Sequence, residues 1–256
     1  MKTTVNERVK VELKNPVLIE GLPGLGMVGR IVTRYLTKQL NAKKFAELHS
    51  PHFPYYVIVN KKGSVRLLHG DFYFWKNEAG ENDLILFTGD SQAQTIEGQY
   101  EVASSILDFA ESHNVKTIVT IGGYRKETEE KPKVVTTSTS PKLLKNALQA
   151  EAVTSGAGAP IVGIAGLLLG MAKFRGIEAL CLLGETRGYL PDPSAAKSVL
   201  DVLQKTLGIK IDLAELDKEI EKSEKLVERM REIEQRRESY SRAMRRVEEE
   251  RVTYIS

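Results

Sequence analysis

The chain has 256 residues, of which 41% are hydrophobic and 28% are charged, enough apolar material for one large domain with an appendage. Its 37 cationic and 34 anionic residues are interspersed and leave a net charge of +3, whereas a nucleic-acid binder gathers its cations into a stripe. No apolar signal segment follows Met1, and the weakly polar stretch 157–172 is too short to span a membrane. We therefore expect a cytoplasmic protein without nucleic-acid or membrane partners.

The first half of the chain alternates segments with strand and helix patterns. A buried strand is predicted at 16–20, and the helix after it at 27–40 has an apolar side. Two further strands, at 53–59 and 65–75, flank the turn Lys61-Lys62-Gly63. Another buried strand is predicted at 83–88.

The pattern repeats in the second half of the chain. The predicted elements are a helix at about 95–111, a strand at 117–121, the turn Gly122-Gly123, a strand at 177–183, the loop Gly184-Glu185-Thr186 and a helix after Pro193. Buried strands separated by helices are typical of a parallel sheet covered on both faces. The sequence thus predicts a three-layer α/β fold with a mostly parallel sheet, plus some antiparallel strands between 53 and 75.

Cysteine and histidine usage indicates neither a disulfide nor a metal site. The single cysteine, Cys181, lies in the apolar run 177–183, so we expect a core cysteine in a reducing compartment rather than a nucleophile. The four histidines lack metal-ligand spacing. Asp90 and Glu185 follow predicted strands, where α/β enzymes place chemistry, but no base or nucleophile is recognisable beside them. We interpret both as loop residues.

The sharpest local motif is the glycine-rich segment Gly21-Leu22-Pro23-Gly24-Leu25-Gly26-Met27-Val28-Gly29. It contains G-x-G-x-x-G, follows a predicted strand and opens a helix, as a dinucleotide site requires. Glu47 could serve as the ribose-binding acid, so an enzyme that uses the Gly21–Gly29 loop is an open alternative. Against it, Pro23 stiffens the turn, and the segment 43–52 lacks the apolar density of a central strand. Glycines can instead permit tight packing between helix and sheet.

Composition changes near Ile211, where glycine and proline disappear and charged residues of both signs dominate. We therefore predict a domain at 1–210 and a charged helical extension at 211–256. Apolar residues recur there in a heptad frame, which is typical of a helix that pairs with partner chains. The expected pairing positions are Leu226, Met230, Ile233, Tyr240, Met244 and Val247.

Several motifs, taken in order, resemble those of the proteasome assembly chaperone family, in particular its archaeal homologues. They are Gly21 to Gly29, Thr88-Gly89-Asp90, Ile121-Gly122-Gly123-Tyr124, Gly163 to Leu169, Leu183-Gly184-Glu185-Thr186 and Pro191-Asp192-Pro193. The resemblance implies a fold similar to nucleoside phosphorylases and related hydrolases, without their catalytic residues. It also implies an ATP-independent scaffold without cofactors that binds the proteasome core particle or its α-subunits. Homo-oligomers are implied too, a tetramer or pentamer being favoured.

The resemblance further implies a role for the C-terminal tail. Some family members end in a hydrophobic-Tyr-X tail that docks between proteasome α-subunits. Here Tyr254 is third from the end, one residue out of register with that motif. The expected partner-binding residues are Val252, Tyr254, Ile255 and Ser256. An NAD-linked or phosphorylase-like enzyme remains the alternative to this non-catalytic role.

Overall fold

The structure, a computed structural model, describes residues 2–80, 82–126 and 131–222. The chain divides into two compact units, Met1–Leu213 and Ala214–Ser256. In the second unit, residues 214–222 are helical. The predicted pairing positions between Leu226 and Val247, and the predicted tail residues from Val252 to Ser256, lie outside the described residues.

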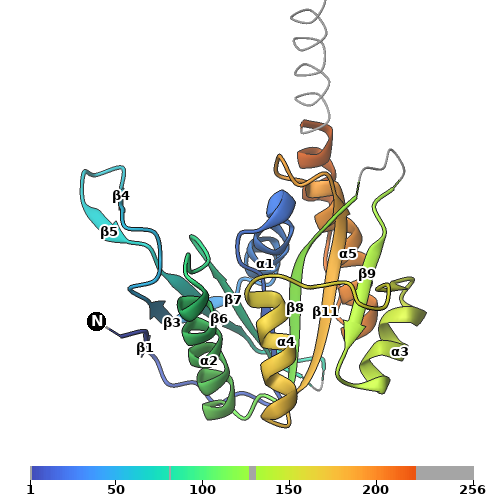
Figure 1. Ribbon diagram of the computed structural model, residues 1–256, viewed down its shortest axis with the longest axis horizontal. Coiled ribbons are helices and arrows are strands. Elements are labelled where there is room, and N and C mark those ends of the chain that lie inside the picture. The colour runs from blue at the N-terminus through green and yellow to red at the C-terminus, as the bar shows by residue number, and fades with distance from the viewer. Residues whose placement is uncertain (1, 81, 127–130, 223–256) are drawn as a thin grey trace, which may run out of the picture. The chain divides into compact units, whose positions relative to one another are not determined.

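In the described part of the first unit, nine strands form one sheet in the order β1-β3-β6-β7-β2-β8-β11-β9-β10 (Figure 1). Their bounds are β1 Thr4–Glu7, β2 Val17–Glu20, β3 Lys43–His49, β6 Gly70–Trp75, β7 Leu84–Gly89, β8 Thr117–Arg125, β9 Val134–Ser138, β10 Val153–Thr154 and β11 Glu178–Thr186. The central strands β7, β2, β8 and β11 are parallel. Strands β6, β3 and β1 continue the sheet antiparallel on one side, and β9 pairs antiparallel with β11 on the other.

The α/β class is therefore confirmed, but the sheet is mixed rather than mostly parallel. The helices are η1 Leu25–Met27, α1 Val28–Gln39, α2 Ile96–Ser112, α3 Pro141–Gln149, α4 Ile164–Phe174 and α5 Pro193–Leu207. Helices α2 and α4 pack side by side on one face of the sheet, while α1 and α5 contact each other on the opposite face (Figure 1). None of the helices in the described residues is long and apolar enough to cross a bilayer.

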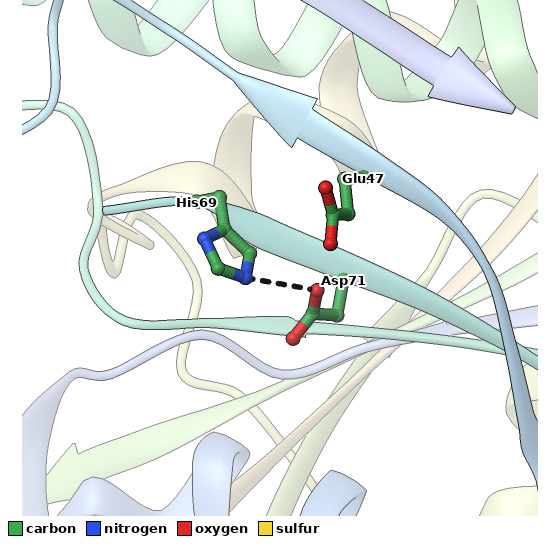
Figure 2. Close-up of side chains that lie close together, drawn as sticks. All are labelled: Glu47, His69 and Asp71. Atoms are coloured by element: carbon green, nitrogen blue, oxygen red, sulfur yellow. Dashed lines mark ion pairs between the residues drawn. The ribbon is translucent and has the colours of Figure 1, made fainter. Parts of the chain in front are cut away.

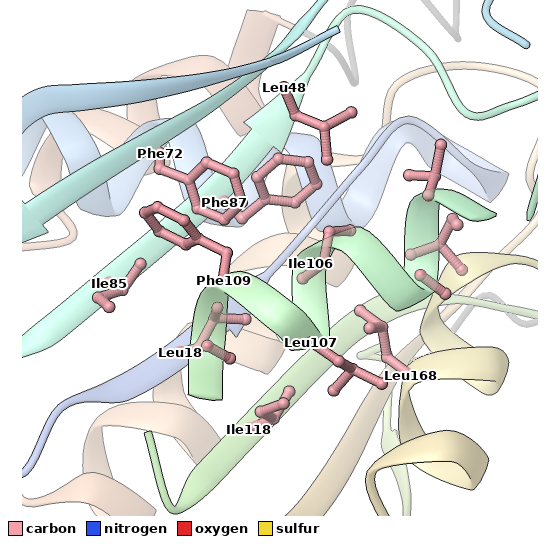
Figure 3. Close-up of a cluster of buried hydrophobic side chains, with 14 of the residues drawn as sticks. Leu18, Leu48, Phe72, Ile85, Phe87, Ile106, Leu107, Phe109, Ile118 and Leu168 are labelled. Atoms are coloured by element: carbon pink, nitrogen blue, oxygen red, sulfur yellow. The ribbon is translucent and has the colours of Figure 1, made fainter. Parts of the chain in front are cut away.

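The sheet face under α2 and α4 carries the main hydrophobic core (Figure 3). Phe72 of β6 lies at its centre, with ring centroids 4.4 Å from Phe87 of β7 and 4.1 Å from Phe109 of α2. The side chain of Thr95 caps the start of α2 by accepting a hydrogen bond from Gly98 N at 3.0 Å. The core and the cap together fix where α2 crosses the strands.

Two glycine segments that the sequence assigned to turns are parts of strands. β8 continues through Gly122-Gly123 to Arg125, and β11 continues through Gly184 to Thr186, with Leu183 and Gly184 in register with the two glycines of β8. Glycines are suited to these strand positions because a residue without a side chain lets neighbouring segments pack closely against the strand. A Cβ atom on Gly123 would lie 2.4 Å from the Leu25 carbonyl oxygen.

The predicted hairpin is present, but it forms a separate small sheet. β4 (Val57–Val59) and β5 (Val65–Leu67) pair antiparallel around a turn in which Gly63 has a φ of 79°. The predicted strand 65–75 is therefore interrupted, since β5 ends at Leu67 and β6 begins at Gly70 in the main sheet. Figure 1 shows the hairpin projecting beyond β3 and β6.

Candidate functional site

The carboxyl ends of the four central strands meet at one edge of the sheet, and the loops that follow them are joined there. Gln92 lies in the loop after β7, and its side chain connects this loop to the loop after β2 and to the start of helix α4. Its Nε2 donates a 2.8 Å hydrogen bond to the Pro23 carbonyl, and its Oε1 accepts one of 3.2 Å from Ile164 N at the start of α4. We call this edge, with its loops, the carboxyl edge.

The backbone donors of the glycine-rich loop are largely used within the protein. Gly21 N donates to Phe87 O at 2.9 Å, and Leu22 N donates to Glu20 Oε1 at 3.0 Å. Gly26 N donates to Gly188 O at 3.4 Å. In a dinucleotide site, such groups point at the pyrophosphate instead. This loop is therefore built to hold neighbouring segments of its own chain.

Except for Gly24, the glycines of this loop also lie too close to their neighbours to carry side chains. A Cβ atom on Gly29 would lie 2.5 Å from the Ile121 carbonyl oxygen. One on Gly26, whose φ is 59°, would lie 2.5 Å from Thr186 Oγ1. Tight packing of the turn against β8 and β11 thus accounts for both glycines.

The assignment of Glu47 as a ribose-binding acid is wrong. Glu47 lies on β3, and two strands, β6 and β7, separate β3 from β2, which leads into the glycine loop. A ribose-binding acid ends a neighbouring parallel strand in a dinucleotide fold. β3 is antiparallel to its neighbours, so Glu47 belongs to a different part of the sheet.

The loop between β11 and α5 closes the carboxyl edge from the other side. Thr186 Oγ1 donates a 2.8 Å hydrogen bond to Asp192 Oδ2, and Asp192 N donates a 2.8 Å hydrogen bond to Gly26 O. The other Asp192 carboxylate oxygen caps α5 by accepting from Ala195 N at 2.8 Å. Asp192 thus ties the glycine loop, β11 and α5 together.

The outer surface of the carboxyl edge is apolar and aromatic. Leu25, Tyr124, Tyr189 and Leu190 are all exposed there, Tyr189 to 72%. The Arg125 guanidinium lies over the Tyr189 ring, 4.8 Å from its centroid. Exposed aromatic side chains beside arginine are typical of surfaces that bind proteins.

The acidic residues that the sequence placed in loops have structural partners. Asp90 binds Arg66 of β5 through both carboxylate oxygens, at 2.5 and 3.0 Å. Glu185 is buried within β11, where it accepts hydrogen bonds from Lys126 Nζ at 2.7 Å and from Lys133 N at 3.1 Å. Burial is the largest single influence and acts to raise the pKa of Glu185, but the hydrogen bonds from Lys126 and Lys133 and the charges of these two lysines together lower the pKa. Both carboxylates anchor segments of the chain.

Two titratable groups lie fully inside the sheet. Glu20 of β2 and Cys181 of β11 flank Thr120 of β8, because both are in register with it. Burial raises the pKa of Glu20 to about 8 and that of Cys181 to about 12. Cys181 is a buried core cysteine, as predicted, and its thiol stays protonated at neutral pH.

One group of side chains in the described part of the chain, Glu47, His69 and Asp71, has the spacing of metal ligands (Figure 2). However, Lys44 Nζ already lies 2.5 Å from Glu47 Oε1 and 2.6 Å from Asp71 Oδ1. Burial acts to raise the pKa of Glu47, but hydrogen bonds and the charge of Lys44, with Arg8 and His49, lower it to about 2. Lys44 bridges the two carboxylates and Arg8 binds Glu47 as well, so the cluster is an ion-pair network between β3 and β6.

Sequence reasoning located the motif segments but missed the residues that join them and the surface they form. Gln92 was not singled out, and the exposed aromatic residues carry no pattern of their own. The segment Pro191-Asp192-Pro193 held a usable signal, because an aspartate before proline is typical of a helix start.

Comparison with known proteins gives concordant matches. The model of the PAC2 family matches residues 18–231. The crystal structure of Pyrococcus furiosus PbaB, described as an archaeal proteasome activator, is 38% identical with a TM-score of 0.86, covering 90% of this chain and 99% of that one. P. furiosus PbaA, an archaeal homologue of proteasome-assembly chaperone, is 28% identical with a TM-score of 0.71, covering 90% and 96%. Protein MJ1210 of Methanocaldococcus jannaschii is 35% identical over 224 residues, covering 87% and 86%.

Proposed function

Because the chain belongs to the PAC2 family, we propose that it is a non-catalytic, ATP-independent assembly chaperone or adaptor of the proteasome. It acts in the cytoplasm, without a cofactor, by binding the proteasome core particle or its α-subunits. The observation that carries this proposal is the similarity, over nearly the whole length, to a protein described as an archaeal proteasome activator.

Two features of the carboxyl edge support a scaffold rather than an enzyme. Backbone N–H groups of the glycine loop donate hydrogen bonds to oxygen atoms of Phe87, Glu20 and Gly188, so these donors are occupied within the chain. The exposed surface beside it, with Leu25 and Tyr189, offers apolar contact area to a protein. Tyrosine is one of the residue types enriched among those that contribute most binding energy in protein interfaces.

We assign core-particle contact to the C-terminal tail, at Val252, Tyr254, Ile255 and Ser256. An aromatic anchor such as Tyr254 suits capture in a pocket between subunits, because its ring buries a large area at a low cost in conformational entropy. The protein acts as a homo-oligomer, a tetramer or pentamer, whose helices pair through the heptad positions from Leu226 to Val247. Several tails on one oligomer then bind by avidity, even if each tail is weak.

The test is binding of the full-length protein to assembled core particles and to separately expressed α-subunits, by native mass spectrometry or surface plasmon resonance. Tyr254→Ala is expected to lower core-particle affinity at least tenfold, because a buried aromatic anchor is worth on the order of 2 kcal/mol or more. Thr253→Ala is the matched control in the same tail and should bind normally.

The outcomes separate the function from the tail. If the full-length protein binds neither core particles nor α-subunits, the proposed function is wrong. Binding that survives Tyr254→Ala places the contact on the α/β unit instead. A clear rise in melting temperature with NAD, ATP or nucleosides would favour the enzyme alternative, since a ligand at 100 times its dissociation constant adds about 2.7 kcal/mol.

A further inference from the structure

The β4–β5 hairpin has one apolar face that the described residues leave uncovered. Val57 pairs with Leu67 and Val59 with Val65, so these four side chains lie on the same face. Their exposed fractions lie between 47% and 65%.

The opposite face of the hairpin fastens it to the α/β unit. Ile58 packs against the main core, and Arg66 forms the paired hydrogen bonds to Asp90. The hairpin is therefore held in place with its apolar face turned away from the unit. A two-stranded hairpin is only marginally stable in water, so a partner that covers this face would also stabilise it.

A second exposed apolar group lies at the base of the hairpin. It consists of Tyr55 and Tyr56, which precede β4, and Ile96 and Tyr100 on the first turns of α2, with Tyr55 fully exposed and Ile96 82% exposed. His52 brings the two segments together, because its ring nitrogens lie 3.2 Å from Thr95 Oγ1 and 3.1 Å from Glu101 Oε2. We call the hairpin face and this group together the hairpin surface.

The hairpin surface approaches the size of a protein interface. Taking about 150–250 Å² for a fully exposed tyrosine and about 60–120 Å² for a fully exposed valine, leucine or isoleucine side chain, the exposed fractions of its eight residues correspond to roughly 500–900 Å². A standard interface buries about 800 Å² on each partner. The largest apolar patch of a typical monomer measures about 300–600 Å² and is often functional.

The charges at the two ends of the hairpin surface are complementary to each other. Lys61 and Lys62 form the exposed tip of the hairpin, and Glu97 is exposed beside Ile96 at the base. If two copies face each other with their hairpins antiparallel, the tip of each hairpin lies over the base of the other. Each lysine pair then meets the partner's glutamate, while the apolar faces cover one another.

We propose that the hairpin surface is a two-fold interface with a second copy of this chain. A two-fold contact uses the same patch on both subunits and closes on itself, which suits a surface carrying both charge signs. Of the two subunit numbers proposed above it requires the tetramer, because a closed ring of five subunits has no two-fold axis. The inference rests on the proposed homo-oligomer for the existence of subunit contacts, and it places one of them away from the C-terminal helix.

The first test is the subunit number of full-length variants, measured by sedimentation equilibrium. Val59→Glu and Val65→Glu each place a charge on the apolar face, where they should raise the dissociation constant of the contact at least a hundredfold and lower the oligomer mass. Val162→Glu is the matched control, because Val162 is 87% exposed outside the hairpin surface. It should leave the mass unchanged, and circular dichroism should show all three variants folded.

The second test is disulfide cross-linking. The native cysteine, Cys181, is fully buried, so any disulfide that forms on oxidation should involve only the introduced surface cysteines. Lys61→Cys combined with Glu97→Cys should give covalent dimers on oxidation, whereas Lys61→Cys combined with Lys142→Cys, on α3, should not. An unchanged oligomer mass in both glutamate variants would overturn the proposal. If these variants also lost core-particle binding, the hairpin surface would instead be assigned to contact with the proteasome. Failure of core-particle binding in the unsubstituted protein concerns the proposed function only.

Discussion

Glu20 carries a carboxyl group in the middle of the sheet, between Phe87 of β7 and Thr120 of β8 in register. Burial raises its pKa to about 8, although the hydrogen bond from Leu22 N acts in the opposite direction. In the unfolded chain the same group releases its proton near pH 4.5. Between these values the folded protein holds the extra proton, so stability is lost as the pH rises from about 4.5 to about 8.

Glu20→Gln should therefore stabilise the protein at alkaline pH. Glutamine resembles the protonated acid and cannot ionise, so the free energy of unfolding at pH 8 should rise by about 1–3 kcal/mol, with little change at pH 5. Urea denaturation at both pH values measures this difference. Glu47→Gln should behave oppositely and lose stability at pH 7, because Glu47 has its pKa lowered to about 2 by its cationic partners. A Glu20→Gln variant that is less stable than the native protein at pH 8 would contradict the argument.

At the scale of elements, the turn before α1 depends on Gly26 in two separable ways. Its φ of 59° is unfavourable for other residues, and a side chain would meet Thr186. Gly63 in the hairpin has a φ of 79°, but a Cβ atom there would have no neighbour within 4 Å. Gly63→Ala should therefore lose about 1–2 kcal/mol for the backbone conformation alone.

Gly26→Ala should lose clearly more stability than Gly63→Ala. Overpacking against Thr186 adds about 1–3 kcal/mol to the cost of the backbone conformation. It also disturbs the bond from Thr186 to Asp192 that closes the carboxyl edge. Melting temperatures of the two variants, compared with the native protein, measure the difference. Equal losses would show that the turn tolerates a side chain and that Gly26 serves the backbone conformation only.

The elements that the sequence predicted well are those with a strong local pattern. The helix at 27–40 and the strand at 83–88 correspond closely to α1 and β7, because their apolar spacing is read without knowledge of neighbours. The extensions of β8 and β11 through glycine were missed, because only pairing with each other makes those residues strands. The position of β3 in the sheet depends on the strand order, which cannot be read from a local sequence pattern.

The candidate site was predictable in its segments and not in its geometry. The order of the glycine-rich motifs led to the family, which is confirmed. The exposure of Leu25 and Tyr189 follows from which loops meet at the carboxyl edge, and that depends on strand order. The hairpin surface was hidden for a similar reason, because alternating valines at 57–67 equally fit a buried strand.

At the scale of the whole molecule, the proposals give the two units different tasks. The hairpin surface and the carboxyl edge belong to the unit Met1–Leu213, whereas the proposed tail contact belongs to Ala214–Ser256. Removal of the second unit should therefore lower core-particle affinity at least tenfold without unfolding the first unit, whose core contains the sheet, α2 and α4.

Two truncations, ending at Leu213 and at Lys222, test this division. Both should stay soluble and unfold cooperatively on heating, because compact units with their own core fold as units. Both should keep the hairpin contact, so that Lys61→Cys with Glu97→Cys still gives covalent dimers in the truncated chains. Core-particle affinity should fall at least tenfold, as in Tyr254→Ala. Aggregation or unfolding of both truncated chains would mean that the second unit is needed for folding, and full binding by either would move the proteasome contact to the first unit.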